Sequence, residues 1–296
     1  MTITATQVKE LRERTAAGMM ECKRALTETD GNMESAIELL RKNGAASAEK
    51  KSGRIAAEGV IALAIDPDQS HGVLVEINCE TDFVAKDQSF LAFSEELTKT
   101  VLAEQPADMS AVSLMLLAGG KSVEETRQTL IAKIGENISV RRFEVIQGEP
   151  GEIFGYSHGT RIGVLVKMVN SDTPSLGRDI AMHVAASQPV CIDETGMPSD
   201  VLEKERDIYR AQAIDSGKSD EIIQKMVEGK VRKFLKDNTL VGQPFVKDPD
   251  TTVRDLLKAH GAVVVAVPRF EVGEGLEKRA DDFVSEVMAQ AQAQAG

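Results

Sequence analysis

Few residues in this sequence have the types and spacing that catalysis or ligand binding requires. The segment GGKS at 119–122 resembles the end of a phosphate-binding loop, but the pattern G-x-x-x-x-G-K-[ST] needs glycine where the chain has Met115. A loop before a capped helix is the better interpretation. The histidines show no metal-binding spacing such as H-E-x-x-H and lie at His71, His158, His183 and His260. We therefore predict no catalytic residue, no bound cofactor and no metal.

A cysteine nucleophile is the remaining catalytic alternative, with Cys79 as the attacking thiol and His158 as its base. Cys79, however, falls on the apolar face of a predicted strand, where thiols are normally buried and inert. His183 shares a helical face with Ile180 and Val184, which favours a packed histidine. The cysteines are odd in number, far apart and without a C-x-x-C pair, so we expect reduced thiols in a cytosol at Cys22, Cys79 and Cys191.

The composition favours a protein partner. The 296 residues carry a formal net charge of −12 and no block of lysine and arginine interleaved with aromatic residues, which disfavours direct nucleic-acid binding. Hydrophobic residues make up 42% of the chain and aromatic residues only 4%, which favours helix-rich aliphatic cores. The N-terminus lacks the features of a signal or transit peptide, and no apolar run reaches the ~18 residues of a membrane span. We expect a cytoplasmic protein that does not bind a membrane.

The elements that position these residues begin with three short helices predicted within residues 1–54. In the second helix Met19, Cys22 and Leu26 recur at helical spacing, which assigns Met19 to the core of this domain. Gly44 is expected to end the third helix. The small and polar residues that follow are interpreted as a linker or a lone exposed helix.

From Gly59 the apolar residues recur with the period of strands. GVIALAI at 59–65 and GVLVEINCE at 72–80 predict a hairpin. In its second strand the apolar residues fall on one face and the polar residues on the other, the pattern of a half-buried strand. The polar face consists of Glu76, Asn78 and Glu80. A helix is expected at 89–103, another from a capping box at Ser122 and Glu125, and then the strand SVRRFEVI.

The segment GVLV occurs twice, starting at Gly72 and at Gly163. Each copy follows a strand-like segment and precedes an amphipathic helix, which suggests two related α+β halves. The second copy has no counterpart of Phe83, so the shared frame does not require this residue.

A purely helical and heavily charged region follows between Asp193 and Gly242. A helix from Ser199 to about Ile214, a short turn and a second helix to Leu235 predict an antiparallel hairpin, or arm. The chain is expected to end as a helix that frays into a low-complexity tail.

A series of motifs runs along the chain: LRERTAAGMMECKRAL at 11–26, EINCETDFVAK at 76–86, GEN at 135–137, HGTRIGVLV at 158–166, IAMHVAAS at 180–187, MVEGK at 226–230, LVGQPFV at 240–246 and RFEVGEGLEK at 269–278. These motifs closely resemble the bacterial elongation factor Ts family, and the likeness spans nearly the whole chain. One departure is Ala16, where the family usually has glycine after the threonine.

The resemblance implies an α+β fold with a set order of domains. A ubiquitin-associated-like (UBA-like) three-helix domain would occupy residues 1–54. Two related core subdomains with antiparallel sheets would follow at 55–146 and 147–275, with a coiled-coil arm inserted in the second at about 193–241. A C-terminal helical module would cover 276–296.

The resemblance also implies a guanine-nucleotide exchange factor, not an enzyme. It would bind elongation factor Tu carrying GDP and promote GDP release and exchange for GTP. The segment that disturbs the magnesium and phosphate site of the GTPase would be Thr81, Asp82, Phe83 and Val84. Further contacts with this partner would come from Arg12, Met19, Met20 and His158. A homodimer, or a two-plus-two complex through the arm, is a further expectation.

A physical role for Phe83 follows from this resemblance. An apolar side chain inserted between two helices of a GTPase can shift a packed element to its other arrangement, and a nearby carboxylate adds unfavourable charge at the metal. Two alternatives stay open. An adaptor whose three-helix domain binds peptides would form complexes without nucleotide release, and a Cys79-dependent enzyme would have a thiol that alkylates readily in the folded state.

Overall fold

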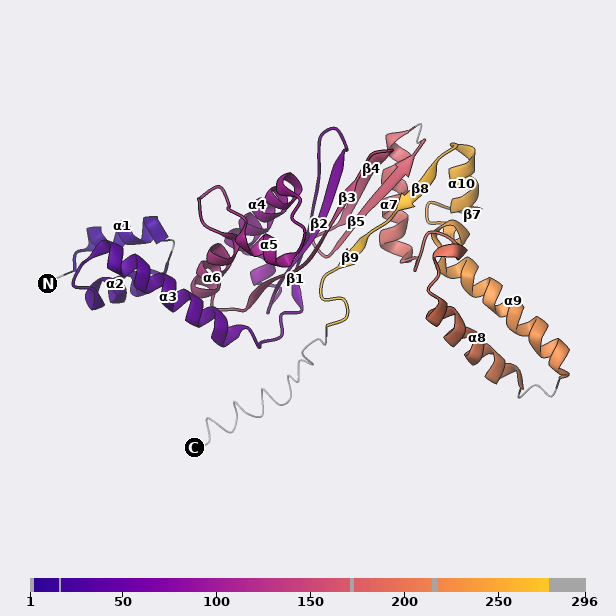
Figure 1. Ribbon diagram of the computed structural model, residues 1–296, viewed down its shortest axis with the longest axis horizontal. Coiled ribbons are helices and arrows are strands. Elements are labelled where there is room, and N and C mark those ends of the chain that lie inside the picture. The colour runs from indigo at the N-terminus through magenta and orange to yellow at the C-terminus, as the bar shows by residue number, and fades with distance from the viewer. Residues whose placement is uncertain (1–2, 16, 171–172, 215–217, 277–296) are drawn as a thin grey trace.

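The N-terminal helices pack into a small bundle, here called the head, at one end of the computed structural model (Figure 1). The structure describes residues 3–15, 17–170, 173–214 and 218–276. The head consists of α1 (Ala5–Thr15), α2 (Met19–Glu28) and α3 (Met33–Lys51). Its core contains Val8, Leu11, Cys22, Ala25, Leu26 and Ala36, which include Cys22 and Leu26 of the predicted stripe.

Met19 lies at the surface, so the prediction that placed it in the core of the head is wrong. Its side chain is 59% exposed and that of Met20 is 69% exposed. Helix α2 begins at Met19, and the buried position beside Cys22 is taken by Ala17, whose carbonyl accepts a hydrogen bond from Cys22 Sγ. The apolar stripe of α2 therefore starts at Cys22, and both methionines face solvent.

Helix α3 continues through Gly44 to Lys51, so the prediction of a helix end at Gly44 is wrong. Gly44 is buried where α3 packs against α6 (Val123–Ile134), and a Cβ atom there would lie 3.8 Å from the Gln128 carbonyl oxygen. A glycine inside a helix costs about 1 kcal/mol relative to alanine. The helix nevertheless continues through Gly44, packs against α6 and joins the head to the rest of the molecule.

The next strands form an antiparallel sheet, the N-terminal sheet, in the order β1-β2-β3. They are β1 (Glu58–Ile65), β2 (His71–Cys79) and β3 (Ile138–Gln147). Pairing of β1 with β2 from Glu58–Cys79 to Ile65–Gly72 confirms the predicted hairpin. Helices α4 (Gln88–Glu104), α5 (Met109–Leu114) and α6 cover one face of the sheet. The core on this face includes Val73, Val75, Ile77, Phe90, Leu97 and Ile131.

A second antiparallel sheet, the C-terminal sheet, has the order β4-β5-β8, and β9 also pairs with β5. Its strands are β4 (Glu152–His158), β5 (Ile162–Val169), β8 (Val263–Ala266) and β9 (Arg269–Glu271). Helix α7 (Pro174–Ser187) packs on β4 and β5, and α10 (Val253–Ala259) with the short strands β6 (Pro244–Phe245) and β7 (Asp248–Thr252) completes this half. The core here includes Phe154, Val164, Val166, Ile180, Val184 and Leu257.

The N-terminal and C-terminal sheets pack on each other through a mirrored pair of glycines. A Cβ atom on Gly72 would lie 3.2 Å from Leu165 Cδ1, and one on Gly163 would lie 2.9 Å from Leu74 Cδ2. The glycine of each GVLV segment therefore leaves space for the leucine of the other segment. This contact gives a packing reason for the repeat seen in the sequence.

Strand β2 is buried on both faces, so the prediction of a half-buried strand is wrong. Glu76 and Asn78 have no exposed surface, and the side chain of Glu80 is only 14% exposed. The polar face of β2 is covered by the C-terminal sheet and by the chain that follows β9. The predicted alternation of apolar and polar residues is present in β2. Its polar face, however, packs against a second layer of the protein and not against solvent.

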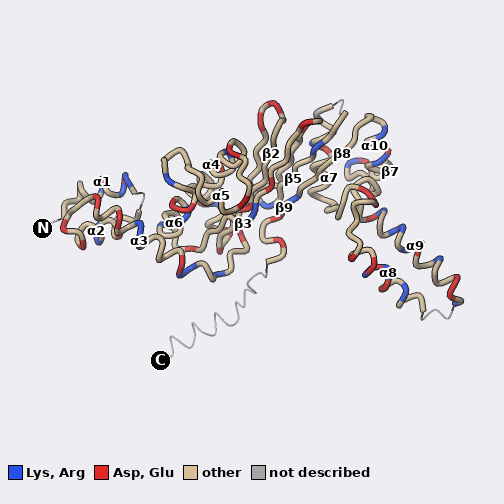
Figure 2. The backbone as a smooth tube through the Cα atoms, in the orientation of Figure 1, with Lys and Arg blue, Asp and Glu red and all other residues tan. Residues whose placement is uncertain are grey.

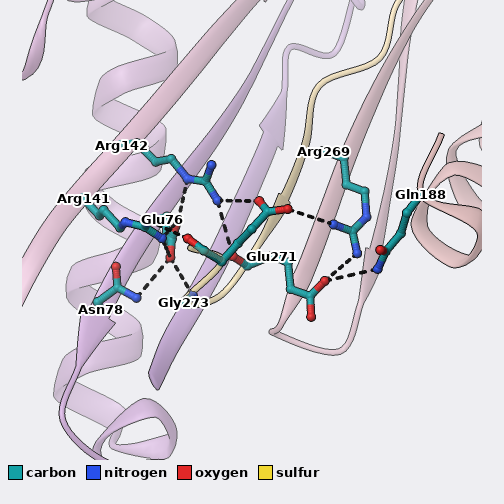
Figure 3. Close-up of polar contacts among 9 residues, drawn as sticks. Glu76, Asn78, Arg141, Arg142, Gln188, Arg269, Glu271 and Gly273 are labelled. Atoms are coloured by element: carbon teal, nitrogen blue, oxygen red, sulfur yellow. Dashed lines mark hydrogen bonds and ion pairs between the residues drawn. The ribbon is translucent and has the colours of Figure 1, made fainter. Parts of the chain in front are cut away.

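The buried Glu76 carboxylate is held by groups from distant parts of the chain (Figure 3). Arg141 Nη1 donates to it at 2.9 Å and Arg142 Nε at 2.6 Å, both from β3. The backbone N–H of Gly273 donates at 2.8 Å and Asn78 Nδ2 at 3.1 Å. These contacts tie β2 and β3 to the segment that leaves the C-terminal sheet.

The hydrogen bonds to Glu76 determine whether its carboxylate is ionised. Burial alone disfavours the carboxylate, but the hydrogen bonds from Gly273, Arg142 and Arg141 outweigh this effect and hold the pKa of Glu76 below its usual value. The carboxylate is therefore charged at neutral pH. Arg142 also stacks over the Phe270 ring, 4.2 Å from its centroid.

The charged region forms the expected antiparallel helix pair, with α8 (Ser199–Ile214) packed on α9 (Asp220–Asn238). Charges of both signs run along both helices (Figure 2). A buried stripe between them contains Leu202, Tyr209, Ala213, Ile223, Val227, Val231 and Leu235. The arm is preceded by η2 (Glu194–Gly196) and followed by η3 (Leu240–Gly242). At its base, the Leu240 N–H donates to the Cys191 carbonyl at 2.8 Å.

None of the helices in the described ranges is both long and apolar enough to cross a membrane. The helix expected at the C-terminal end of the chain lies outside the described residues.

We expect Gly163→Ala to lower the free energy of unfolding by about 1–3 kcal/mol. The added methyl group would lie 2.6 Å from Ile61 Cγ2 and 2.9 Å from Leu74 Cδ2. Gly119→Ala is the matched control, since no heavy atom lies within 4 Å of its Cβ position. Urea unfolding followed by circular dichroism measures the difference. Equal stability of the two variants would contradict the close packing of the sheets.

We expect Glu76→Gln to destabilise the protein by about 1–3 kcal/mol at neutral pH, because it removes the buried charge that accepts hydrogen bonds from the half-buried Arg141 and Arg142. The pKa of Glu76 is lowered by folding, so its contribution is present above the usual value of 4.5 and is lost as the pH falls below it. Thermal unfolding across this range should show the parent and variant converging in acid. Glu95→Gln, which changes an exposed carboxylate, is the control. A difference in melting temperature between parent and Glu76→Gln that is the same at every pH would refute this role.

Candidate functional site

The loop after β2 presents an aromatic side chain to solvent. Phe83 is 81% exposed, whereas Val84 and Ala85 are only 8% and 7% exposed. Val84 begins the short 3-10 turn η1 (Val84–Lys86), and the Asp87 side chain then caps α4. Phe83 points outward because the inward positions of the loop are filled by its neighbours.

Hydrogen bonds around Thr81 hold the backbone of this loop in one turn. The Thr81 carbonyl accepts from the N–H of Ala85 at 3.2 Å, and Thr81 Oγ1 accepts from the N–H of Val84 at 3.3 Å. The Phe83 carbonyl accepts from the N–H of Lys86 at 3.1 Å. Phe83 therefore stands on an ordered turn, and an exposed aromatic group on a rigid support is typical of a protein-binding anchor.

Asp82 places a negative charge beside Phe83. Its carboxylate forms an ion pair with Lys86 Nζ at 2.7 Å, and both side chains are exposed. The hydrogen bond from Lys86 lowers the pKa of Asp82, so this carboxylate is ionised at neutral pH. The loop thus combines an apolar ring and a carboxylate on adjacent residues.

Cys79 is not a nucleophile at neutral pH. The thiol is fully buried and donates to the Thr81 carbonyl at 3.2 Å. Burial raises the pKa of Cys79 to about 12, so the thiolate is scarcely populated. His158, the base of the catalytic alternative, instead lies with Nδ1 3.2 Å from the Tyr156 hydroxyl.

His158 is exposed at the end of β4, in the turn that leads to β5. This turn lies beside the start of β1, where Arg161 forms an ion pair with Glu58. Glu58 pairs with Cys79 in the N-terminal sheet. The structure therefore places His158 and the Phe83 loop at the same end of the packed sheets.

Arg12, Met19 and Met20 lie exposed on the head. Arg12 is exposed on α1, and the two methionines are exposed at the start of α2. The structure does not bring them into the Phe83 loop. Ala16, between these helices, lies outside the described residues.

Glu136 contacts the Phe83 loop and was not among the predicted site residues. Its carboxylate accepts hydrogen bonds from the N–H groups of Glu80 and Thr81 at 3.1 and 3.0 Å, and from Thr81 Oγ1 at 2.7 Å. The motif GEN contained this residue, but only the fold shows that it meets a loop distant in sequence.

The other sequence candidates have structural roles. GGKS forms the loop before α6, and Ser122 Oγ accepts from the Glu125 N–H at 3.1 Å, as expected of a capping box. His183 is fully buried, with Nε2 2.9 Å from Gln243 Oε1, and burial lowers its pKa. Among the described side chains, no cluster of three or more histidine, cysteine, aspartate or glutamate residues is arranged to hold a metal ion.

Comparison with known proteins identifies the family. A sequence model described as Elongation factor TS matches residues 80–274. Elongation factor Ts of Thioalkalivibrio sulfidiphilus is 58% identical over 292 residues, covering 98% of this chain and 99% of that protein. The Methylococcus capsulatus protein of the same name is 55% identical over 293 residues, covering 99% and 100%. The chain therefore belongs to the elongation factor Ts family, the nucleotide exchange factors of elongation factor Tu.

Proposed function

We propose that the loop from Thr81 to Val84 is the segment with which this exchange factor releases GDP from elongation factor Tu. The observation that carries the proposal is the 81% exposed Phe83 on an ordered turn. Each Å² of apolar surface that leaves water contributes about 25 cal/mol, so the ring gains free energy when it enters a partner.

Insertion of Phe83 between helices of the GTPase would act on the nucleotide indirectly. A GTPase holds GDP through backbone N–H groups around the phosphates and through a magnesium ion. Packed elements have discrete arrangements, so an inserted ring moves them from one arrangement to another. Asp82 brings a carboxylate to the magnesium and phosphate site, where negative charge opposes nucleotide binding.

The residues of the loop divide this work. Phe83 and Asp82 face outward and contact the partner, while Val84 is buried and supports the loop from inside. Thr81 is half-buried and fixes the backbone. This division refines the expectation that all four residues disturb the magnesium site.

A large contact is needed because the coupling is reciprocal. A factor that weakens GDP binding is itself bound more weakly in the presence of GDP, by the same factor. Each tenfold effect requires about 1.4 kcal/mol. In our proposal Arg12, Met19, Met20 and His158 provide further contacts with the same GTPase, and so does the chain after β9.

The finer architecture belongs to the same proposal. The head acts as the UBA-like docking domain at 1–54, and the core subdomains at 55–146 and 147–275 are related, which the mirrored glycines support. The arm at about 193–241 is a coiled coil. Its exposed apolar side chains offer a surface for a second copy, in a homodimer or a two-plus-two complex, and include Ile208, Ile214 and Ile222. The protein acts in the cytoplasm, with translation.

We expect Phe83→Ala to slow the release of fluorescent GDP from magnesium-loaded elongation factor Tu by about tenfold or more, the effect of losing an interface anchor. Asp82→Ala should slow release less, because its charge is already paired with Lys86. Stopped-flow fluorescence measures the rates. Leu114→Ala, which truncates another exposed apolar side chain at 77% exposure, is the matched control.

The same measurement of GDP release with the parent protein distinguishes an exchange factor from an adaptor. An adaptor forms a complex with the GTPase without accelerating GDP release. Unchanged release by Phe83→Ala, in a protein that still accelerates exchange, would remove the loop from the mechanism.

We expect the double variant Met19→Ala/Met20→Ala to raise the concentration of factor needed for half-maximal exchange by about tenfold. The maximal rate should stay close to that of the parent, because the head would contribute binding and not the displacement of magnesium. Rates measured over a range of factor concentrations separate the two quantities. A lowered maximal rate with unchanged half-saturation would contradict this assignment.

A further inference from the structure

The Glu136 carboxylate is the meeting point of the loop that carries Phe83 and the loop that precedes β3. Gly135 ends α6 in the left-handed conformation, with φ at 91°, and Glu136 follows it directly. Three donors of the Phe83 loop converge on this one carboxylate: the N–H groups of Glu80 and Thr81 and the Thr81 hydroxyl. Hydrogen bonds to a charged acceptor are stronger than those between neutral groups.

The contact between these loops is reciprocal. Glu80 Oε1 accepts from the N–H of Asn137 at 2.6 Å and from Arg54 Nη1 at 3.3 Å. Asn137 Nδ2 in turn donates to the carbonyl of Arg54 at 2.9 Å. The chain that leaves the head, the Phe83 loop and the loop before β3 are therefore joined in one hydrogen-bonded junction.

The junction acts on the backbone at the base of the exposed residues. Glu136 touches neither Phe83 nor Asp82 in these hydrogen bonds, and binds only the two residues before them. Thr81 connects Glu136 to the backbone of Val84, because its hydroxyl donates to Glu136 and accepts from the N–H of Val84. Removing the carboxylate would leave these donors to water and release the start of the turn.

We propose that Glu136 is a positioning residue for nucleotide exchange, which holds the Phe83 loop in the conformation that enters elongation factor Tu. The inference rests on the proposed role of Phe83. An ordered loop does not lose conformational entropy when it enters its partner, so more of the contact energy remains available to displace the bound nucleotide. Glu136 thus affects the maximal rate of GDP release from the complex, and affects the other binding surfaces little.

A double-mutant cycle tests this role. The variants are Glu136→Ala, Phe83→Ala and the double variant, and the readout is the maximal rate of fluorescent GDP release at saturating factor. We expect Glu136→Ala to lower this rate about tenfold in the parent, and by less than about twofold when Phe83 is already alanine. Glu95→Ala, which removes an exposed carboxylate of α4 paired with Lys99, is the control.

Substitutions at Thr81 keep the test decisive if Glu136→Ala lowers the melting temperature. Thr81→Val keeps the shape but removes the hydroxyl and its hydrogen bonds to Glu136 and Val84, and we expect a loss of about fivefold or more in the maximal rate. Thr81→Ser keeps the hydroxyl and should restore the parental rate. A merely structural role would change stability in both backgrounds without this dependence on Phe83.

The outcomes separate the two claims. Slower release by Phe83→Ala with an unchanged rate for Glu136→Ala would overturn the positioning role and leave the proposed exchange loop intact. Equal losses from Glu136→Ala with and without Phe83 would also overturn it. An unchanged rate for Phe83→Ala would overturn both.

Discussion

The buried charge of Glu76 is the constraint on which the arrangement of the sheets depends. A carboxylate without solvent is tolerated only when its charge and lone pairs are satisfied, and here Arg141, Arg142 and the N–H of Gly273 satisfy them. These partners come from β3 and from the end of the C-terminal sheet. The carboxylate thus ties β2 to β3 and to the chain after β9, and the Phe83 loop begins three residues further along the same strand, after Cys79.

The molecule separates rigid support from the surfaces offered to a partner. The packed sheets bury aliphatic side chains, while the exposed apolar groups discussed above are on the head, on the loop after β2, on α5 and on the arm. An exchange factor has no bond to break, so its residues need only hold shape and present contacts. This is why the described side chains are arranged for packing and docking rather than for proton transfer or metal binding.

Local signals in the sequence predicted most elements, because caps, turns and periodicity depend on neighbouring residues. The strands β1 and β2, the capped helix α6 and the paired helices of the arm follow from such signals. The error at Met19 is local, since Ala17, two residues earlier, takes the buried position beside Cys22. The errors at Gly44 and Glu76 each involve a partner distant in the chain, because α6 packs against the glycine and a second sheet covers the glutamate. Glu136 was missed for the same reason. The alternating pattern ends before Phe83, and this residue lies exposed beyond the end of β2, while its role in exchange stays a prediction.

The glycines between the sheets carry an evolutionary consequence. Gly72 faces Leu165 and Gly163 faces Leu74, so the packing of each sheet depends on side chains of the other. A larger residue at Gly72 would also meet Ile153, and one at Gly163 would also meet Ile61, so neither glycine can be enlarged without changes in several residues of the facing sheet. Positions 72 and 163 are therefore expected to stay small among descendants of this chain, while the loop that follows β2 is under no such restriction and can specialise in one half alone.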